Sequence, residues 1–87
     1  MKNDDFPITK KYLIFDRYVT LDADFIVKNK RKKEDIGTIG YFKKWKKYVF
    51  YPYSDTYFCS ICLTEIKEFM EELNEKIKNN LQKIGLI

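Results

Sequence analysis

The sequence predicts a single α+β domain, in which a small antiparallel sheet of three to five strands packs against one C-terminal amphipathic helix. In the first two thirds of the chain, apolar residues occur in short segments rich in β-branched and aromatic residues, separated by turn-forming residues. From about residue 60 the apolar period changes from two to about 3.6 residues, which is typical of a helix that buries one face. The 87 residues of the chain are enough for one core.

The chain begins with a lead-in over residues 1–9, which is polar and ends near Phe6-Pro7, so we expect it to be loosely ordered. The domain itself covers residues 10–87. We expect strands over 11–15, 23–28, 36–42, 48–51 and 56–58. Gly37 and Gly40 within the third of these predict a bulge or a close approach of two backbones.

The helix is predicted over about residues 60–82. Its apolar positions recur at spacings of three and four, at Leu63, Ile66, Phe69, Met70, Leu73, Ile77, Leu81 and Ile84. Glutamates dominate its first half and lysines its second half, which suits the helix dipole. We interpret its outer face as an ordinary solvated surface.

Charge is unevenly distributed along the chain. Residues 28–47 carry nine basic groups against Glu34 and Asp35, a net charge of +7 in a chain whose total is +4. A block of one sign attracts polyanions, acidic protein surfaces or anionic membranes, and this attraction weakens as salt rises. The sequence therefore predicts a basic binding surface within these twenty residues.

A hairpin with a basic tip is the feature of this block that best predicts a function. Its lysines suit phosphate groups, while Trp45, Tyr41, Phe42 and Tyr48 offer rings on which bases can stack. The predicted binding residues are Lys28, Lys30, Arg31, Lys32, Lys33, Lys43, Lys44, Trp45, Lys46 and Lys47. Lys outnumbers Arg here, so the binding is expected to be largely independent of base sequence. In the alternative interpretation Trp45 fills the core and the lysines form a solvated or protein-binding face.

Catalysis is not expected. The chain has no His, no P-loop and no nucleophile elbow, and its carboxylates are spread between turns and a helix surface. Asp16, Asp22 and Asp24 are interpreted as turn and surface residues rather than as a metal cluster. We therefore predict no catalytic residue, no metal site and no cofactor.

Cys59 and Cys62 form the only cysteine pair, spaced as CxxC. The favoured interpretation is two reduced thiols packed at a strand-to-helix junction, because free Cys is among the most buried residue types. A metal shared across a dimer and redox chemistry stay open as alternatives.

The location and assembly of the chain are predicted from equally simple features. No apolar run approaches the roughly 18 residues of a membrane span, and residues 1–5 lack the apolar stretch of a signal peptide. We expect a cytoplasmic protein with no membrane partner. A chain this short gains little stability from its own core, so a homo-oligomer is also plausible.

A longer pattern covers just under half the chain. It comprises Gly37, Ile39, Trp45, the strand end Tyr48-Val49-Phe50-x-Pro52, the helix start Cys62-Leu63-x-Glu65-Ile66-x-x-Phe69, and Leu73-Asn74. This pattern resembles small uncharacterised accessory proteins of phages and prophages. The resemblance implies a protein that handles nucleic acid or that binds and blocks a bacterial defence system, such as a CRISPR effector.

The leading hypothesis is a non-enzymatic phage-type protein whose basic, aromatic hairpin binds nucleic acid. The second hypothesis is a protein inhibitor of a host defence protein, acting through the same surface or through the acidic helix face. A third is an oligomer that holds small phosphorylated nucleotides between its basic loops.

Overall fold

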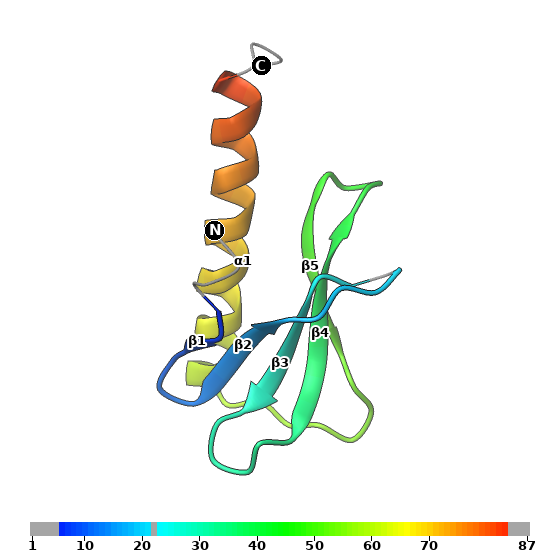
Figure 1. The fold of residues 1–87 in the computed structure, drawn as a ribbon. Helices are drawn as coiled ribbons and strands as arrows, with labels where there is room; N and C mark the ends of the chain where they lie inside the picture. Colours follow the sequence, from blue (N-terminus) through cyan, green and yellow to red (C-terminus); the bar gives the residue numbers. More distant parts are fainter. Residues whose placement is uncertain (1–5, 22, 84–87) are drawn as a thin grey trace.

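The structure, a computed structural model, describes residues 6–21 and 23–83, with helix side chains described as far as residue 77. Its elements are β1 (Ile8–Thr9), β2 (Leu13–Arg17), β3 (Phe25–Asn29), β4 (Asp35–Phe42), β5 (Lys47–Pro52) and α1 (Ser60–Lys83). The strands form one antiparallel sheet in the order β1-β2-β3-β4-β5, and α1 covers one face (Figure 1). The predicted α+β fold is confirmed.

Two elements differ from the sequence predictions, and the ends of the other strands shift by at most two residues. β1 lies inside the lead-in predicted over residues 1–9, of which residues 1–5 are outside the described part of the chain. The strand predicted over 56–58 does not form. The chain there crosses from the edge strand β5 to α1, and Phe58 packs edge-on against Phe50 with ring centroids 5.5 Å apart. Burial of Phe58 thus fixes this segment without strand pairing.

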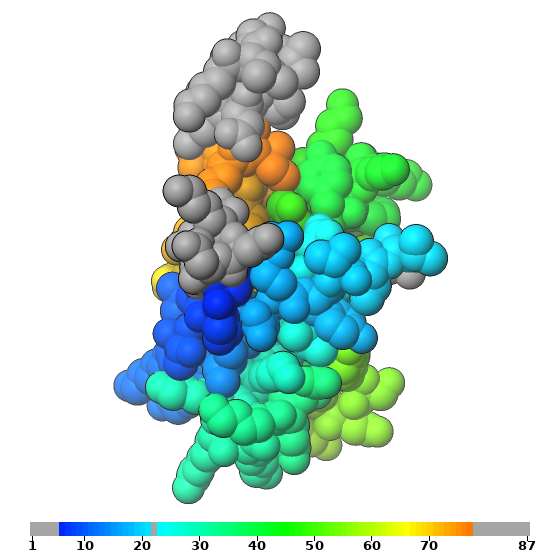
Figure 2. Space-filling model, viewed as in Figure 1, coloured from blue at the N-terminus to red at the C-terminus, as the bar shows by residue number. Residues whose placement is uncertain are grey.

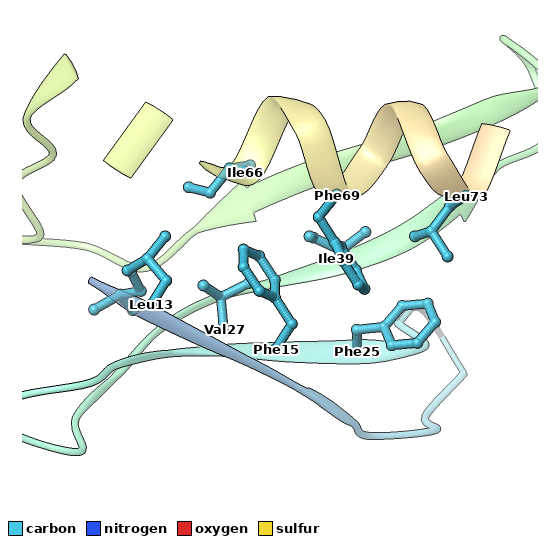
Figure 3. Packing of buried hydrophobic residues seen from close by; sticks show 9 residues of the cluster. Leu13, Phe15, Phe25, Val27, Ile39, Ile66, Phe69 and Leu73 are labelled. Atoms are coloured by element: carbon cyan, nitrogen blue, oxygen red, sulfur yellow. The ribbon is translucent and has the colours of Figure 1, made fainter. Parts of the chain in front are cut away.

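The register of the sheet assigns alternate side chains to opposite faces. Phe15, Val27 and Gly37 are aligned across three strands, and Phe25, Ile39 and Phe50 are aligned in a neighbouring row. These rows face α1, whose Ile66, Phe69 and Leu73 point toward them (Figure 3). The alternate apolar residues of the strands and the apolar stripe of α1 therefore pack together in a single core.

Phe69 is the centre of that core. Its ring stacks on Phe15 at 4.4 Å and meets Phe25 edge-on at 5.2 Å, and it is fully buried. Such ring pairs contribute about 0.5–1.5 kcal/mol each beyond the area they bury. The helix is thereby fixed against the neighbouring strands β2 and β3.

Gly37 permits β4 and β5 to pack closely. A Cβ atom there would lie 2.6 Å from Phe50 Cε1 and 2.6 Å from the Tyr51 carbonyl oxygen. The register between β3 and β4 shifts just beside it, because Val27 pairs with Gly37 whereas Lys28 pairs with Asp35. The extra residue of this bulge, Ile36, joins the core cluster.

Two polar side chains of α1 attach the helix to opposite ends of the sheet. The carboxylate of Glu65 is only 8% exposed and accepts hydrogen bonds from the backbone N–H groups of Tyr12 (3.2 Å) and Leu13 (3.1 Å). Asn74 Oδ1 accepts a 2.8 Å hydrogen bond from the backbone N–H of Tyr48. Since β5 is an edge strand, Asn74 also satisfies a donor that would otherwise face outward.

Candidate nucleic-acid interface

The β4–β5 hairpin ends in a tight four-residue turn. Phe42 and Lys47 form the last strand pair, and the Trp45 N–H donates to the Phe42 carbonyl at 3.1 Å. Lys46 completes the turn with a positive φ of 55°, and its N–H donates to the Lys43 carbonyl at 3.2 Å. The turn projects its side chains beyond the sheet. We call Lys43, Lys44, Trp45, Lys46 and Lys47 the tip cluster.

Trp45 is outside the core. Its side chain is 62% exposed, and its ring meets Phe42 edge-on with centroids 5.0 Å apart. The alternative in which Trp45 fills the core is therefore wrong: the turn carries the ring past the last strand pair and out of reach of α1. An exposed indole supported by a second ring has a free face on which another planar group can stack.

Phe42, Val49 and Tyr51 extend this aromatic surface over the sheet face opposite α1. The strand register places Phe42 on that face, and the same alternation places Val49 and Tyr51 beside it. We call this surface the open face, since no described element packs across it (Figure 1).

Two hollows lie next to each other on this side of the sheet. One, of about 260 Å³, is lined by Phe42, Trp45, Val49, Phe50 and Tyr51. The other, of about 420 Å³, is lined by Leu21, Ala23, Asp24, Tyr41, Phe42, Lys43 and Tyr51. They share Phe42 and Tyr51, so these two residues line both hollows. Two adjacent hollows of this kind can accommodate successive planar groups of one chain molecule.

The four lysines of the tip cluster are exposed, and none forms an ion pair with another described side chain. Lys28 differs, because its Nζ lies 3.4 Å from Asp35 Oδ1 in a half-exposed pair on the open face. A neighbouring carboxylate offsets its charge toward an anionic ligand. Lys28 is thus the predicted binding residue that the structure supports least.

The remaining predicted residues are at the other end of β4. Lys30, Arg31, Lys32 and Lys33, which we call the turn cluster, form the β3–β4 turn. Asn29 organises this turn: its side-chain oxygen accepts from the Lys32 N–H at 2.9 Å and its carbonyl from the Lys33 N–H at 2.7 Å. Lys33 has a positive φ of 61°. Three of the cluster's residues, with Lys11, Tyr12 and Asn29, line a groove of about 590 Å³.

The two clusters are separate surfaces. They occupy opposite ends of β4, as the projecting turns in Figure 2 show. At about 3.4 Å per residue, the seven steps from Asp35 to Phe42 place them roughly 24 Å apart. The Debye length at physiological salt is about 8 Å, so their charges act largely independently. The single basic surface predicted from the sequence is divided by the fold.

Tyr41 and Tyr48 are paired with each other rather than with the tip. Their rings meet edge-on at 5.5 Å, and Tyr48 also packs 6.2 Å from Phe25 at the edge of the core. Burial raises the pKa of the Tyr48 phenol above its ordinary value, and the negative charge of Asp24 raises it further. Tyr48 therefore serves the hairpin as a packing residue.

Tyr51 and Val49 are site residues that the sequence analysis missed. The alternation of side chains along β5 could have identified them, because residues two apart in a strand share a face. Lys47, Val49 and Tyr51 are spaced in this manner and therefore lie on one face. Leu21, fully exposed beside the larger hollow, carried no such signal because it belongs to a loop.

Metal binding and a membrane-spanning helix have no structural support in the described part of the chain. No group of three or more His, Cys, Asp and Glu side chains lies close enough there to hold a metal ion. Of the three aspartates considered in the sequence, Asp22 is outside the described residues. Within residues 6–21 and 23–83, no helix has the length and apolar character needed to cross a bilayer.

Comparison of the chain with models of known families, with curated proteins and with solved structures finds no match. The resemblance to phage accessory proteins stays a prediction. The geometry of the two clusters and of the open face is therefore the basis for assigning a function to this protein.

Proposed function

We propose that this protein binds single-stranded nucleic acid, largely without sequence preference, through the tip cluster and the adjoining open face. The observation that carries the proposal is the exposed ring of Trp45, held edge-on against Phe42 in a tip cluster that also carries four lysines. Bases stack on such rings whatever their identity, and ammonium groups neutralise the phosphates between them.

A single strand fits this surface better than a duplex does. Phe42 and Tyr51 line both of two adjacent shallow hollows, and bases can occupy such hollows only when they are splayed out of a helix. Asp24 lies in the larger hollow and repels phosphate there, whereas Lys43 lines the same hollow and attracts it. The backbone of the strand is therefore expected to follow the lysine side.

The chain offers a direct test because Trp45 is its single Trp. Fluorescence excited at the long-wavelength edge of the indole absorption, where the seven Tyr do not absorb, reports on this residue alone, and base stacking should quench it. We expect a labelled oligodeoxythymidylate to quench Trp45 and to gain anisotropy with the same midpoint. If four lysines contact phosphates, the logarithm of affinity should fall with the logarithm of salt at a slope of about −3.

The outcomes of this titration are distinct. Coincident quenching and anisotropy with a steep salt slope support the proposal. Anisotropy without quenching would place binding away from Trp45, most simply at the turn cluster, and would overturn the assignment of the site. No change in either signal at low salt would overturn nucleic-acid binding itself.

A second candidate function is inhibition of a bacterial defence protein, and the acidic face of α1 is the feature that favours it. Glu68, Glu71, Glu72 and Glu75 line a shallow groove of about 410 Å³ on this face. A basic protein surface would complement it. Capture of one defence protein at equal stoichiometry, lost on replacing Glu68 and Glu72 with Lys, is the result that this candidate requires.

A further inference from the structure

Cys59 occupies the N-cap position of α1. The helix begins at Ser60, and the Leu63 N–H donates to the Cys59 carbonyl at 3.1 Å. Cap positions usually carry a side-chain oxygen that accepts from a first-turn N–H. Here the acceptor is sulfur, since the Cys62 N–H donates to Cys59 Sγ at 3.4 Å.

The two thiols are in direct contact. Their Sγ atoms are 3.3 Å apart, so forming a disulfide of about 2.0 Å requires an approach of roughly 1.3 Å. The first turn of α1 has no acidic residue to oppose a negative charge, and the helix dipole favours such a charge at this end. Both features suit a thiolate at Cys59.

The environments of the two thiols differ. Cys59 is exposed, whereas Cys62 is half-buried and packs against the hydrophobic core. The expectation of two packed thiols is therefore wrong for Cys59. Hydrogen bonds from the Cys62 backbone N–H and thiol lower the pKa of Cys59. Burial raises the pKa of Cys62, and its hydrogen bond to Cys59 raises it further.

The shared S–H hydrogen bond can point either way while both thiols are protonated. Ionisation of Cys59 fixes its direction, because only Cys62 then has a proton to donate. One sulfur is thus accessible and easily ionised, and the other is sheltered, protonated and in contact with it. This division suits a nucleophile and a resolving thiol.

We propose that Cys59 and Cys62 form a thiol–disulfide exchange site that reacts with low-molecular-weight disulfides. The Cys59 thiolate attacks one sulfur of the external disulfide, giving a mixed disulfide and releasing the other sulfur as a thiolate that takes up a proton. Cys62 then loses its proton and attacks Cys59 Sγ, which expels the second external thiol. The protein dithiol loses two electrons and two protons, and the external disulfide becomes two thiols.

The site is distinct from the proposed nucleic-acid interface. The start of α1 lies toward the same end of the sheet as the β3–β4 turn, whereas the tip cluster projects at the opposite end (Figure 1). Failure of one proposal therefore leaves the other unaffected.

The test uses the full chain, reduced and then exposed to oxidised glutathione, with intact mass measured after the free thiols are alkylated. The wild type should lose both alkylatable thiols and retain no glutathione. Cys62→Ser should accumulate one glutathione on Cys59, because the resolving thiol is missing. Cys59→Ser should react about tenfold more slowly at neutral pH than Cys62→Ser, since Cys62 is protonated and half-buried.

The same three proteins in urea supply the matched control. Unfolding removes the cap, so the two single variants should then react at equal rates. Circular dichroism verifies that each variant is folded before the comparison is made. Two glutathiones on the folded wild type, or equal rates for the two folded variants, would overturn the proposal.

Discussion

The tip cluster and the turn cluster have nearly the same composition but very different settings. Each carries four basic side chains, each contains one lysine with positive φ, and each lies at one end of β4. The tip cluster also has an exposed Trp45, whose ring contacts Phe42 edge-on. Trp45 lines a hollow together with residues of the open face. The turn is built around the hydrogen bonds of Asn29, and its exposed ring is Tyr12, which has Lys11 5.6 Å from its centroid.

This difference shows that a charge block does not define a binding site by itself. Lysines supply attraction that any polyanion shares, and the fold decides whether rings are available beside them. Matched pairs of variants test this difference, most of them by comparing the two ends of β4.

Reversing charge should have the largest effect. Lys43→Glu/Lys46→Glu should weaken oligodeoxythymidylate binding about 100-fold at low salt, because two phosphate contacts become repulsive. Lys30→Glu/Lys33→Glu is the matched control, since it changes net charge equally and likewise alters one lysine with positive φ. Fluorescence anisotropy measures both variants, and equal losses would mean that net charge rather than the tip controls binding.

Removing a ring should have the next largest effect. Trp45→Ala should weaken binding about 30-fold, since loss of base stacking costs about 1–3 kcal/mol, whereas Trp45→Phe should retain most of the affinity. Tyr12→Ala removes an exposed ring at the opposite end and should leave affinity unchanged. Anisotropy with labelled oligonucleotide suffices here, and a larger loss for Tyr12→Ala would move the site to the turn cluster.

Glu65 and Asn74 attach α1 to opposite ends of the sheet, and removing each should lower the free energy of unfolding by a different amount. Glu65→Ala leaves the Tyr12 and Leu13 N–H groups without their acceptor and should lower the free energy of unfolding by about 2–3 kcal/mol. Asn74→Ala removes one hydrogen bond, to Tyr48 N–H, and should cost about 1 kcal/mol. Urea unfolding gives both values.

Binding measurements complete that comparison. Asn74→Ala should also weaken oligonucleotide binding, because Asn74 fixes the strand that leads from the tip, while Glu65→Ala should not. A binding defect confined to Glu65→Ala would contradict the assignment of the interface to the tip.

The smallest expected effect concerns alkaline pH. Because burial raises the pKa of Tyr48, the folded chain holds the phenolic proton more tightly than the unfolded chain does. This contribution to stability is complete below the ordinary tyrosine pKa of about 10 and is lost as pH rises through the folded value. The Tm of the wild type should therefore fall more steeply above pH of about 10 than that of Tyr48→Phe.

Tyr57→Phe is the control for that measurement, since Tyr57 is 94% exposed and does not belong to the core cluster. Its Tm should follow the wild type across the alkaline range. Identical profiles for Tyr48→Phe and the wild type would show that burial of the phenol contributes nothing measurable.

Much of the fold was predictable because its signals are local. The helix predicted over about 60–82 forms over Ser60–Lys83, and the strand predicted over 36–42 forms over Asp35–Phe42. β1 was not predictable, since two residues beside a Pro carry no periodicity, and Ile8 and Thr9 form a strand only through pairing with Phe15 and Ile14. The strand expected over 56–58 failed for a related reason: its β propensity was outweighed by packing of Phe58 on Phe50.

The amino-acid sequence by itself determined the α+β class, the basic block and the position of Trp45 in a turn, because periodicity, charge and turn chemistry act between near neighbours. Tertiary structure alone decided that the block is two clusters, that Trp45 is exposed outside the core, and that Cys62 packs against the core while Cys59 is exposed. Those outcomes depend on the pairing of β4 with its neighbouring strands and on the face of the sheet that α1 covers. Strand pairing and helix packing both join residues distant in the chain.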